Sequence, residues 1–549
     1  MSLSDTRADQ MFPTFDAVQM ESAQRFASGP ARSFAAGEHV FRIADEHSPA
    51  WLVLDGSIEV VRRDGLNHET PIVTYHRGQL TGEVAQLSGR PALAGGHAGP
   101  EGCRALPFDA AHLRALMIGS ADIGEIVMRA LILRRVGLIQ EGAGTILIGV
   151  PGSADITRLQ NFLNRSGHPN LVLDVRSDEE GRAFVERAGV LPQELPLVVC
   201  PNGAILKRPS ETEMAACLGL TPELAPDALY DVAIVGAGPS GLAAAVYAAS
   251  EGLSVIVLDE HTMGGQAGAS ARIENYLGFP TGISGQALAG RAFNQALKFG
   301  AEMAIPLGVK QLECADAHGA GSPLSLRLAD DQRIRARTVI VASGARYRRP
   351  DIAELSKFEG AGVSYWVSPT EAKLCDGEEV ALVGGGNSAG QAIAFLAPKV
   401  KRLHLIVRRP LAATMSRYLI DRIAALPNVT MHVGSEIVGL EGDAAGALQA
   451  ATFRRVADGT ISRCTLHHVF LFIGADPNAG WLEGCVETDD KGFIVTGRTG
   501  RPLETSLPGV FAIGDVRAGS TKRVASAVGE GAAVVAQIHA TLAEHFPAA

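Results

Sequence analysis

The stretch Asp231-Val-Ala-Ile-Val235, which runs directly into Gly236-Ala-Gly238-Pro239-Ser240-Gly241, decides the fold of the larger part of this chain. The apolar run predicts a buried strand, and the glycines fit a turn that opens a helix expected over 242–250. A second apolar run, Ser254-Val-Ile-Val-Leu258, ends at Asp259. Glycines let the backbone approach a pyrophosphate, the helix N-terminus offers free N–H groups, and Asp259 can accept hydrogen bonds from a ribose diol. This order of elements therefore predicts a Rossmann-like dinucleotide site.

A second fingerprint, Gly384-Gly-Gly386-Asn387-Ser388-Ala389, follows about one domain length later. A strand is expected over 379–383 before it, and a helix over 388–396 after it. The next apolar run, 402–407, ends in Arg408-Arg409 rather than in an acid. Guanidinium groups suit a 2′-phosphate, which an acid would repel, so this pair favours NADPH over NADH. The alternative is that both arginines are solvated charges at a strand end.

Composition is that of an ordinary soluble protein, and 549 residues suggest three or four domains. The net charge of −10, without a long basic run, argues against nucleic acid as a partner. Residues 232–250 carry no charge, but they hold the first fingerprint, so no membrane insertion is expected. The seven cysteines include no CxxC pair, and Cys200 and Cys217 fit buried free thiols. With an N-terminus that lacks an apolar signal segment, this predicts a cytoplasmic protein, and we expect no metal site.

The N-terminal region, residues 1–140, reads as short strands with glycine turns and then a helix. On Gly37, Gly56, Gly78 and Gly82-Glu83-Val84-Ala85 it resembles the cyclic-nucleotide-binding domain. The resemblance implies an arginine directly after a proline as the phosphate ligand, but here Ala92 follows Pro91, and Arg90 precedes it. A cyclic nucleotide is therefore a candidate ligand, and the alternative is a barrel kept for packing or for another ligand.

Residues 143–220 follow a β-α-β-α order, and Pro196 opens a later strand. This region resembles the thioredoxin fold, in which that proline is cis and faces a CxxC at the start of the first helix. Here the helix starts at Pro151-Gly-Ser153-Ala-Asp155, without cysteine. We therefore expect a thioredoxin-like domain without a redox-active dithiol.

Residues 228–549 resemble the low-molecular-weight thioredoxin reductases along their whole length. The resemblance implies an FAD domain over 228–345 and 465–549, an NADPH domain over 346–464 inserted into it, a homodimer, and domains that rotate during turnover. It rests on both fingerprints and on Gly264-Gly265-Gln266, Glu274-Asn275-Tyr276-Leu-Gly278-Phe-Pro280, Arg408-Arg409 and Gly514-Asp515. The FAD contacts expected are Gly236, Gly238, Pro239, Ser240, Gly241, Asp259, Gly265, Gln266, Asn275, Gly514 and Asp515. The NADPH contacts expected are Gly384, Gly386, Asn387, Ser388, Ala389, Arg408 and Arg409.

The chain departs from this family where the redox dithiol belongs. After Gly362-Val-Ser-Tyr365 the family places Cys-x-x-Cys, and this chain has Trp366-Val-Ser-Pro369. Trp366 and Pro369 cannot form a disulfide, and Cys375 is the only thiol nearby, so no catalytic residue is assigned.

The sequence thus predicts an α/β multidomain chain. Two Rossmann-like domains, for FAD and NADPH, follow a β-barrel cyclic-nucleotide-binding-like domain and a thioredoxin-like domain. The leading hypothesis is an FAD-dependent NADPH oxidoreductase whose acceptor is a quinone, a ferredoxin-like carrier or a small oxidant. The alternatives are a thioredoxin-disulfide reductase that uses other thiols, such as Cys200, and a regulatory flavoprotein that responds to nucleotide or redox state.

Overall fold

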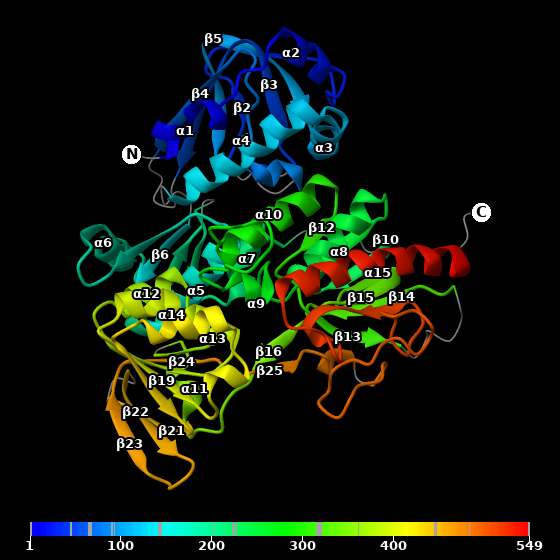
Figure 1. Ribbon diagram of the computed structural model, residues 1–549. Coiled ribbons are helices and arrows are strands. Elements are labelled where there is room, and N and C mark those ends of the chain that lie inside the picture. Colours follow the sequence, from blue (N-terminus) through cyan, green and yellow to red (C-terminus); the bar gives the residue numbers. More distant parts are fainter. Residues whose placement is uncertain are drawn as a thin grey trace.

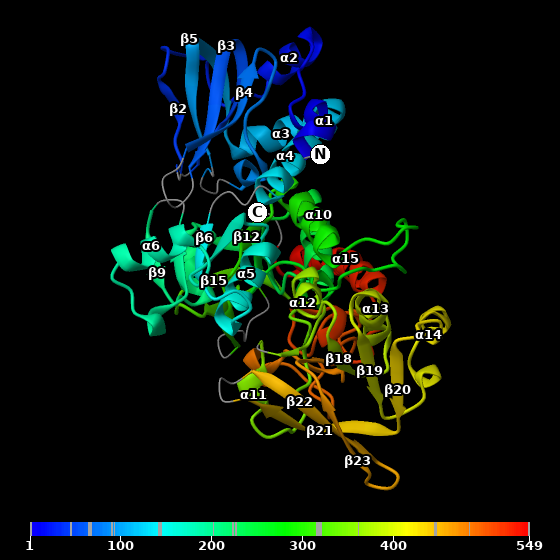
Figure 2. The ribbon, with the colours of Figure 1, turned by 90° about the vertical axis from the view of Figure 1, so that its left-hand side faces the viewer.

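The computed structural model describes residues 3–546, with gaps at 44, 46, 64–68, 89–91, 93, 141–144, 201–202, 222–223, 226–227, 315–320, 361, 444–446 and 483. The chain forms an N-terminal β unit, a small α/β unit and two larger α/β units (Figure 1). The N-terminal sheet lies at one end of the molecule, and the other units lie below it in the view of Figure 2.

The N-terminal unit is an antiparallel sheet in the order β1-β5-β3-β4, with β2 paired to β5. Two short helices precede the sheet and two longer ones follow it. Apolar residues of α3 and α4 join one continuous buried cluster with residues of the third unit, so the N-terminal unit packs on that unit through these helices. The elements are α1 (Leu3–Met11), α2 (Ala17–Gln24), β1 (Arg32–Phe34), β2 (His39–Phe41), β3 (Ala50–Arg63), β4 (Glu69–His76), β5 (Gly95–Phe108), α3 (Ala110–Gly119) and α4 (Ala121–Gln140).

The second unit is a four-stranded sheet in the order β7-β6-β8-β9. β6 and β7 are parallel, whereas β8 pairs antiparallel with both β6 and β9. The peptide bond between Leu195 and Pro196 is cis. The side chain of Ser153 caps α5 by accepting from the backbone N–H of Ile156. The elements are β6 (Thr145–Gly149), α5 (Ala154–Arg165), β7 (Asn170–Asp174), α6 (Glu179–Arg187), β8 (Leu197–Val199), β9 (Ile205–Lys207) and α7 (Glu211–Cys217).

The third unit holds the first fingerprint, in the turn between β10 and α8. Its seven-stranded sheet runs β12-β11-β10-β15-β14-β13, and β26 pairs parallel with β15 although more than 160 residues separate them. The chain therefore leaves this sheet after β15 and returns to it near its end. The elements are β10 (Leu229–Val235), α8 (Pro239–Ser250), β11 (Val255–Leu258), α9 (Gly265–Gly268), α10 (Gly285–Lys298), β12 (Glu302–Ala304), β13 (Val309–Glu313), β14 (Leu324–Leu328), β15 (Arg333–Val341), β26 (Val510–Ala512) and α15 (Val524–His545).

The fourth unit lies inside that long excursion. Its parallel sheet runs β17-β24-β18-β19-β20 and carries an antiparallel sheet, β21-β22-β23. β24 still pairs with β18, so the chain leaves this sheet after Leu471 rather than at the predicted residue 465. The elements are α11 (Leu355–Phe358), β17 (Val363–Ser364), α12 (Pro369–Leu374), β18 (Glu379–Val383), α13 (Asn387–Leu396), β19 (Arg402–Val407), α14 (Arg417–Ala424), β20 (Val429–Val433), β21 (Ser435–Gly442), β22 (Leu448–Arg455), β23 (Ile461–Thr465) and β24 (His468–Leu471). The third and fourth units are joined by the antiparallel pair β16 (Ala345–Tyr347) and β25 (Ala475–Pro477).

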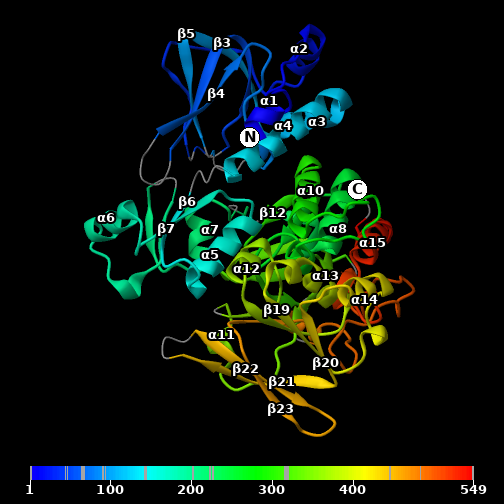
Figure 3. The same cartoon turned by 60° about the vertical axis from the view of Figure 1, so that its left-hand side comes forward.

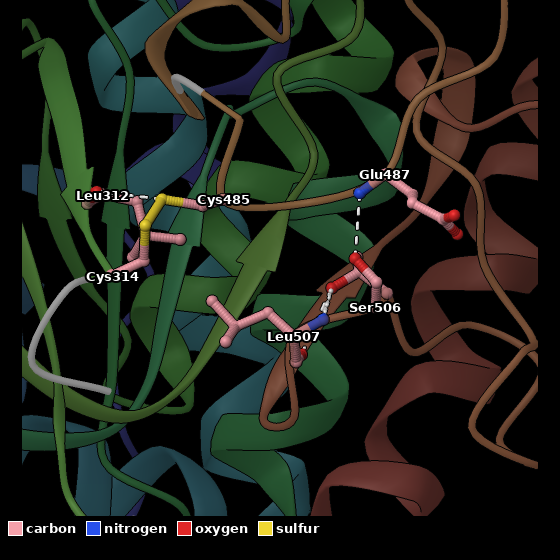
Figure 4. The surroundings of a disulfide bond; sticks show 7 residues. Leu312, Cys314, Cys485, Glu487, Ser506 and Leu507 are labelled. Carbon is pink, nitrogen blue, oxygen red and sulfur yellow. Dashed lines mark hydrogen bonds between the residues drawn. A yellow bond between two sulfur atoms is a disulfide. The ribbon is translucent and has the colours of Figure 1, made fainter. Parts of the chain in front are cut away.

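Four of the seven cysteines form disulfides, so the expectation that Cys200 and Cys217 are free thiols is wrong. Cys200 is bonded to Cys217, and Cys314 to Cys485 (Figure 4). Sequence spacing could not reveal the second bond, because its partners lie 171 residues apart and only the fold brings β13 beside the segment that holds Cys485. The cysteines therefore no longer favour a reducing compartment, because that inference assumed that Cys200 and Cys217 were free thiols.

Within the described ranges, no helix is both long and apolar enough to cross a lipid bilayer. The same residues contain no group of three or more His, Cys, Asp or Glu side chains placed to hold a metal ion.

Candidate functional site

The first glycine loop packs so closely against neighbouring backbone atoms that side chains do not fit at two of its positions. Gly236 has φ +114°, and a Cβ atom there would lie 2.2 Å from the carbonyl oxygen of Ala342. At Gly241 a Cβ atom would lie 1.9 Å from the carbonyl oxygen of Gly236. Gly238, by contrast, has open space where its Cβ would be, and it begins α8 without a side-chain cap. The loop therefore offers an open face beside uncapped N–H groups of a helix, which is the arrangement that binds a pyrophosphate.

Further residues of the predicted FAD set gather around this loop. A Cβ on Gly265 would lie 3.1 Å from the Cα of Gly238, and one on Gly514 would lie 2.5 Å from Oγ of Ser240. The side-chain amide of Gln266 donates to the carbonyl oxygen of Ala345. Gly236, Gly238, Ser240, Gly241, Gly265, Gln266 and Gly514 thus lie together, with Pro239 at the first helical position.

Asp515, Asn275 and Asp259 occupy different surroundings. Burial raises the pKa of Asp515, with Lys522 opposing the rise and Glu530 adding to it. Asn275 is exposed, and no described hydrogen bond ties it to the loop. The carboxylate of Asp259 accepts from the backbone N–H of Ala237 at 2.8 Å and of His261 at 2.9 Å. Asp259 therefore orients the glycine loop in this structure, and its contact with a ribose stays a prediction.

The second glycine loop repeats the close packing of the first. Gly384 has φ +139°, and a Cβ there would lie 2.2 Å from the carbonyl oxygen of Phe472, just beyond β24. Gly386 begins α13 without a side-chain cap and has open space beside it. Asn387 accepts from the backbone N–H of Ser416 at 2.7 Å, while Ser388 is exposed and Ala389 is buried. The N-terminus of α13 is therefore open and uncapped, as in helices that bind a pyrophosphate.

Arg408 and Arg409 follow the last residue of β19, and both are exposed. Neither forms an ion pair with any carboxylate among the described residues. Their charges are therefore available to an anion at the end of the strand that follows the second loop. This exposure fits the phosphate interpretation and also the alternative of two solvated charges.

Protein-family models match most of the third unit, the whole fourth unit and most of the N-terminal unit. Residues 230–531, more than half of the chain, match the family described as pyridine nucleotide-disulphide oxidoreductase. The chain belongs to the pyridine nucleotide-disulphide oxidoreductase family. Residues 31–119 match the family described as cyclic nucleotide-binding domain.

Similar proteins include several thioredoxin reductases of this family. That of Mycolicibacterium smegmatis is 32% identical over 321 residues, which are 58% of this chain and 97% of that protein. NADPH-dependent thioredoxin reductase 3 of Arabidopsis thaliana is 32% identical over 308 residues, which cover 55% of this chain and 56% of that protein. The crystal structure of Lactococcus lactis thioredoxin reductase in its FR conformation aligns with a TM-score of 0.53 and 27% identity, over 57% of this chain and 99% of that one.

As a member of the pyridine nucleotide-disulphide oxidoreductase family, the chain is an NADPH-dependent flavin oxidoreductase with FAD and NADPH as cofactors. The residues present fit both groups. Each glycine loop leaves the N-terminus of a helix uncapped and open, and each packs too tightly against a neighbouring strand to accept a side chain at its first glycine.

In the segment Trp366–Pro369, where the resemblance predicts the family's dithiol, the buried carboxylate of Glu371 accepts several hydrogen bonds. Trp366 donates its indole N–H to Oε1 of Glu371 at 3.1 Å, and the backbone N–H of Ser368 donates to Oε2 at 2.9 Å. Pro369 is the first residue of α12. Asn161, from α5 of the second unit, donates to the same Oε1 at 3.1 Å. The segment that lacks cysteines is thus held against the second unit, and α5 and α12 lie side by side (Figure 3).

An aromatic contact joins this segment to the connection between the third and fourth units. The rings of Tyr347 and Tyr365 are stacked, with centroids 6.1 Å apart and planes 17° apart. Tyr347 belongs to β16, directly after the crossover strand β15. Burial raises the pKa of Tyr347 to about 12, so its hydroxyl stays protonated at neutral pH.

Cys375, the thiol nearest to Trp366 in sequence, is fully buried. Burial raises its pKa to about 12, and the carboxylates of Glu371 and Glu378 add to the effect. Because the thiolate is the nucleophile, a thiol that stays protonated at neutral pH is inert. The Cys375 thiol is therefore not suited to act as a redox nucleophile.

In the N-terminal unit, Glu83 is buried and is paired with Arg135 of α4 at 3.4 Å. Arg135 also donates to the carbonyl oxygen of Gly167 at 2.7 Å, so it connects Glu83 of the N-terminal unit with the second unit. Ala92 is buried. Arg90 and Pro91, on which the sequence argument about a cyclic phosphate rested, lie outside the described residues.

Sequence reasoning missed Asn161 and Arg165, two residues of α5 that reach the other units. Asn161 contacts Glu371, and Arg165 donates to the carbonyl oxygen of Gly265 at 3.2 Å. Both stand on the solvent-facing pattern of an amphipathic helix, where polar residues are ordinarily solvated. No sequence signal distinguishes them, because the contacts depend on how separate units pack.

Proposed function

We propose that this flavin oxidoreductase takes electrons from NADPH and delivers them to an acceptor other than the disulfide of a thioredoxin. The acceptor class is a quinone, a ferredoxin-like one-electron carrier or a small oxidant. The observation that supports this is the segment Trp366–Pro369, which has no thiol and is fixed by buried Glu371.

In this proposal the chain binds and orients the two cofactors. Gly238 and Gly386 leave the N-termini of α8 and α13 open, where the two pyrophosphates would bind, and Gln266 and Asp515 would contact the flavin. Bound FAD supplies the capacity to accept a hydride and to release its electrons singly or in pairs. Orientation of the two cofactors is the contribution asked of the protein, and no side-chain acid or base is required for the hydride step.

The described cysteines give little support to the alternative of a thioredoxin-disulfide reductase. Cys200 is fully buried and bonded to Cys217, and Cys375 is buried as a protonated thiol. Disulfide exchange requires an accessible sulfur and a thiolate to attack it.

The same resemblance that supports the cofactors also supports a homodimer, which sedimentation equilibrium would test.

NADPH should bleach the bound FAD. Mixed with excess NADPH without oxygen in a stopped-flow spectrophotometer, the purified protein should lose its flavin absorbance near 450 nm in a saturable phase. NADH at the same concentration should act at least about tenfold more slowly, because it lacks the 2′-phosphate. A flavin that stays oxidised would contradict the proposed function.

An acceptor screen identifies the second half of the reaction. NADPH oxidation should be fast with a quinone, ferredoxin or ferricyanide, and slow with oxidised thioredoxin. The Cys200→Ser, Cys217→Ser double variant is the control, since it removes the buried disulfide of the second unit. Rapid thioredoxin reduction that this variant abolishes would favour the disulfide-reductase alternative instead.

The Arg408→Ala, Arg409→Ala double variant should lose its preference for NADPH. Each charge-assisted contact to a phosphate is worth ~1.5–3 kcal/mol, so KM for NADPH should rise about 10-fold to more than 100-fold while KM for NADH changes little. The matched control is Arg402→Ala, at the exposed start of the same strand. Equal losses with both nucleotides would mean that the two arginines are solvated charges without a role in selectivity.

A further inference from the structure

Arg165 reaches from the second unit to the open face of the first glycine loop. It is the last residue of α5, and its Nη2 atom donates to the carbonyl oxygen of Gly265 at 3.2 Å. Gly265 in turn packs against Gly238, whose other side is open. The guanidinium group therefore lies at the edge of the space that faces the N-terminus of α8.

The guanidinium of Arg165 forms no close ion pair in the part of the chain that the structure describes. No carboxylate in the described ranges lies within 4.0 Å of its guanidinium, and its Nε atom is buried without a hydrogen-bond partner. Burial lowers its pKa, and the more distant charge of Asp259 is the strongest of the groups that oppose the change. The guanidinium is half-buried and has no direct ion pair, although the more distant carboxylates of Asp259, Glu211 and Glu371 favour its charge.

An anion on the open face would satisfy both features at once. It would pair with the guanidinium through its Nη atoms and lie against the N–H groups that α8 leaves uncapped. The cofactor expected at this loop carries such a group, since FAD contains a pyrophosphate. A planar guanidinium group can donate two parallel hydrogen bonds to two oxygens of one phosphate, which the ammonium group of a lysine cannot do. An arginine at position 165 therefore suits this ligand better than a lysine would.

We propose that Arg165 binds the pyrophosphate of FAD, and that the second unit is thereby a part of the flavin site. The proposal rests on FAD as the cofactor and not on the identity of the electron acceptor. It gives a thioredoxin-like unit without a dithiol a function in this chain, because that unit supplies a cofactor-binding residue to another unit.

Flavin binding by the apoprotein tests this directly. FAD would be removed from the full-length protein, and its Kd measured by quenching of flavin fluorescence for the wild type, Arg165→Met, Arg165→Lys and Arg158→Met. Arg158 stands two turns earlier on α5 and pairs with Asp155, so it is a matched control. Arg165→Met should weaken FAD binding about 10- to 100-fold, Arg165→Lys less, and Arg158→Met less than twofold.

Two probe ligands separate pyrophosphate binding from mere docking of α5. ADP carries a pyrophosphate and riboflavin does not, so Arg165→Met should weaken competition by ADP and leave binding of riboflavin unchanged. Equal weakening of all ligands, or FAD affinity within twofold of the wild type, would overturn the proposal. Far-UV circular dichroism checks the fold, and Arg165→Lys carries the test if the methionine variant is unfolded.

This result is independent of the proposed function. The flavin that remains bound to Arg165→Met should still be bleached by NADPH, because Arg165 has no described contact with the second glycine loop. Loss of FAD affinity with intact bleaching supports Arg165 and the oxidoreductase together. Intact affinity with absent bleaching would overturn both.

Discussion

The Gly384→Ala variant should keep its FAD and fail to reduce it with NADPH. A Cβ atom at this position would lie 2.2 Å from the carbonyl oxygen of Phe472. The alanine would also have to keep the φ of +139° that Gly384 has in the structure. Both the overlap and the left-handed backbone cost free energy, together more than about 3 kcal/mol, so the turn at the start of α13 must move. A cofactor held at that helix N-terminus would lose its position, and the rate of flavin reduction should fall more than about 100-fold.

Flavin content and flavin reduction are the two measurements for Gly384→Ala. The absorbance ratio at 450 and 280 nm should match the wild type, while the stopped-flow bleaching phase should vanish at wild-type NADPH concentrations. Gly439→Ala is the control in the same unit, because a Cβ there would make only ordinary contacts with Thr452, at 3.6 Å or more. Wild-type bleaching in Gly384→Ala would show that the second loop does not hold NADPH.

The Gly236→Ala variant should be purified without FAD. A Cβ atom there would lie 2.2 Å from the carbonyl oxygen of Ala342, at the end of the central strand β15, and Gly236 has φ +114°. The loop cannot retreat from β15, since β10 and β15 are paired in register up to Val235 and Val341. The open face beside Gly238 should therefore be displaced, and FAD affinity should fall by more than about 100-fold.

Protein-bound flavin after gel filtration measures this outcome, with thermal unfolding as a check on the fold. The control is Gly290→Ala on α10, where a Cβ meets nothing within 4 Å and alanine favours the helix. A yellow Gly236→Ala protein with normal FAD content would contradict the assignment of the first loop to FAD.

Much of the two nucleotide-binding units could be predicted from local sequence. The glycine loops, the strands that precede them and the return of the chain to β15 through β26 all follow from short apolar runs and glycine spacing. The boundary predicted at residue 465 comes before β24, and a strand of four residues is too short a pattern to show which sheet it joins. Only pairing with β18 assigns it to the fourth unit.

What escaped the sequence depends on tertiary proximity. The bond between Cys314 and Cys485 joins segments 171 residues apart. Asp259 stands at its predicted place after β11, yet in the structure its carboxylate binds the N–H of Ala237. Arg165 and Asn161 carry no motif, since their partners lie in other units. Local sequence patterns predict the secondary structure of a segment, whereas these contacts depend on which other segments it packs against.

Helix α5 has a consequence for motion. Near its middle, Asn161 is bound to Glu371 of the fourth unit, and at its end Arg165 is bound to Gly265 of the third. A single helix of 12 residues is a rod ~18 Å long that bends little. A rotation of the third unit against the fourth about the β16–β25 connection would change the distance between Glu371 and Gly265, so these two hydrogen bonds to α5 oppose it. The second unit thereby favours the one setting of the third and fourth units that satisfies both hydrogen bonds.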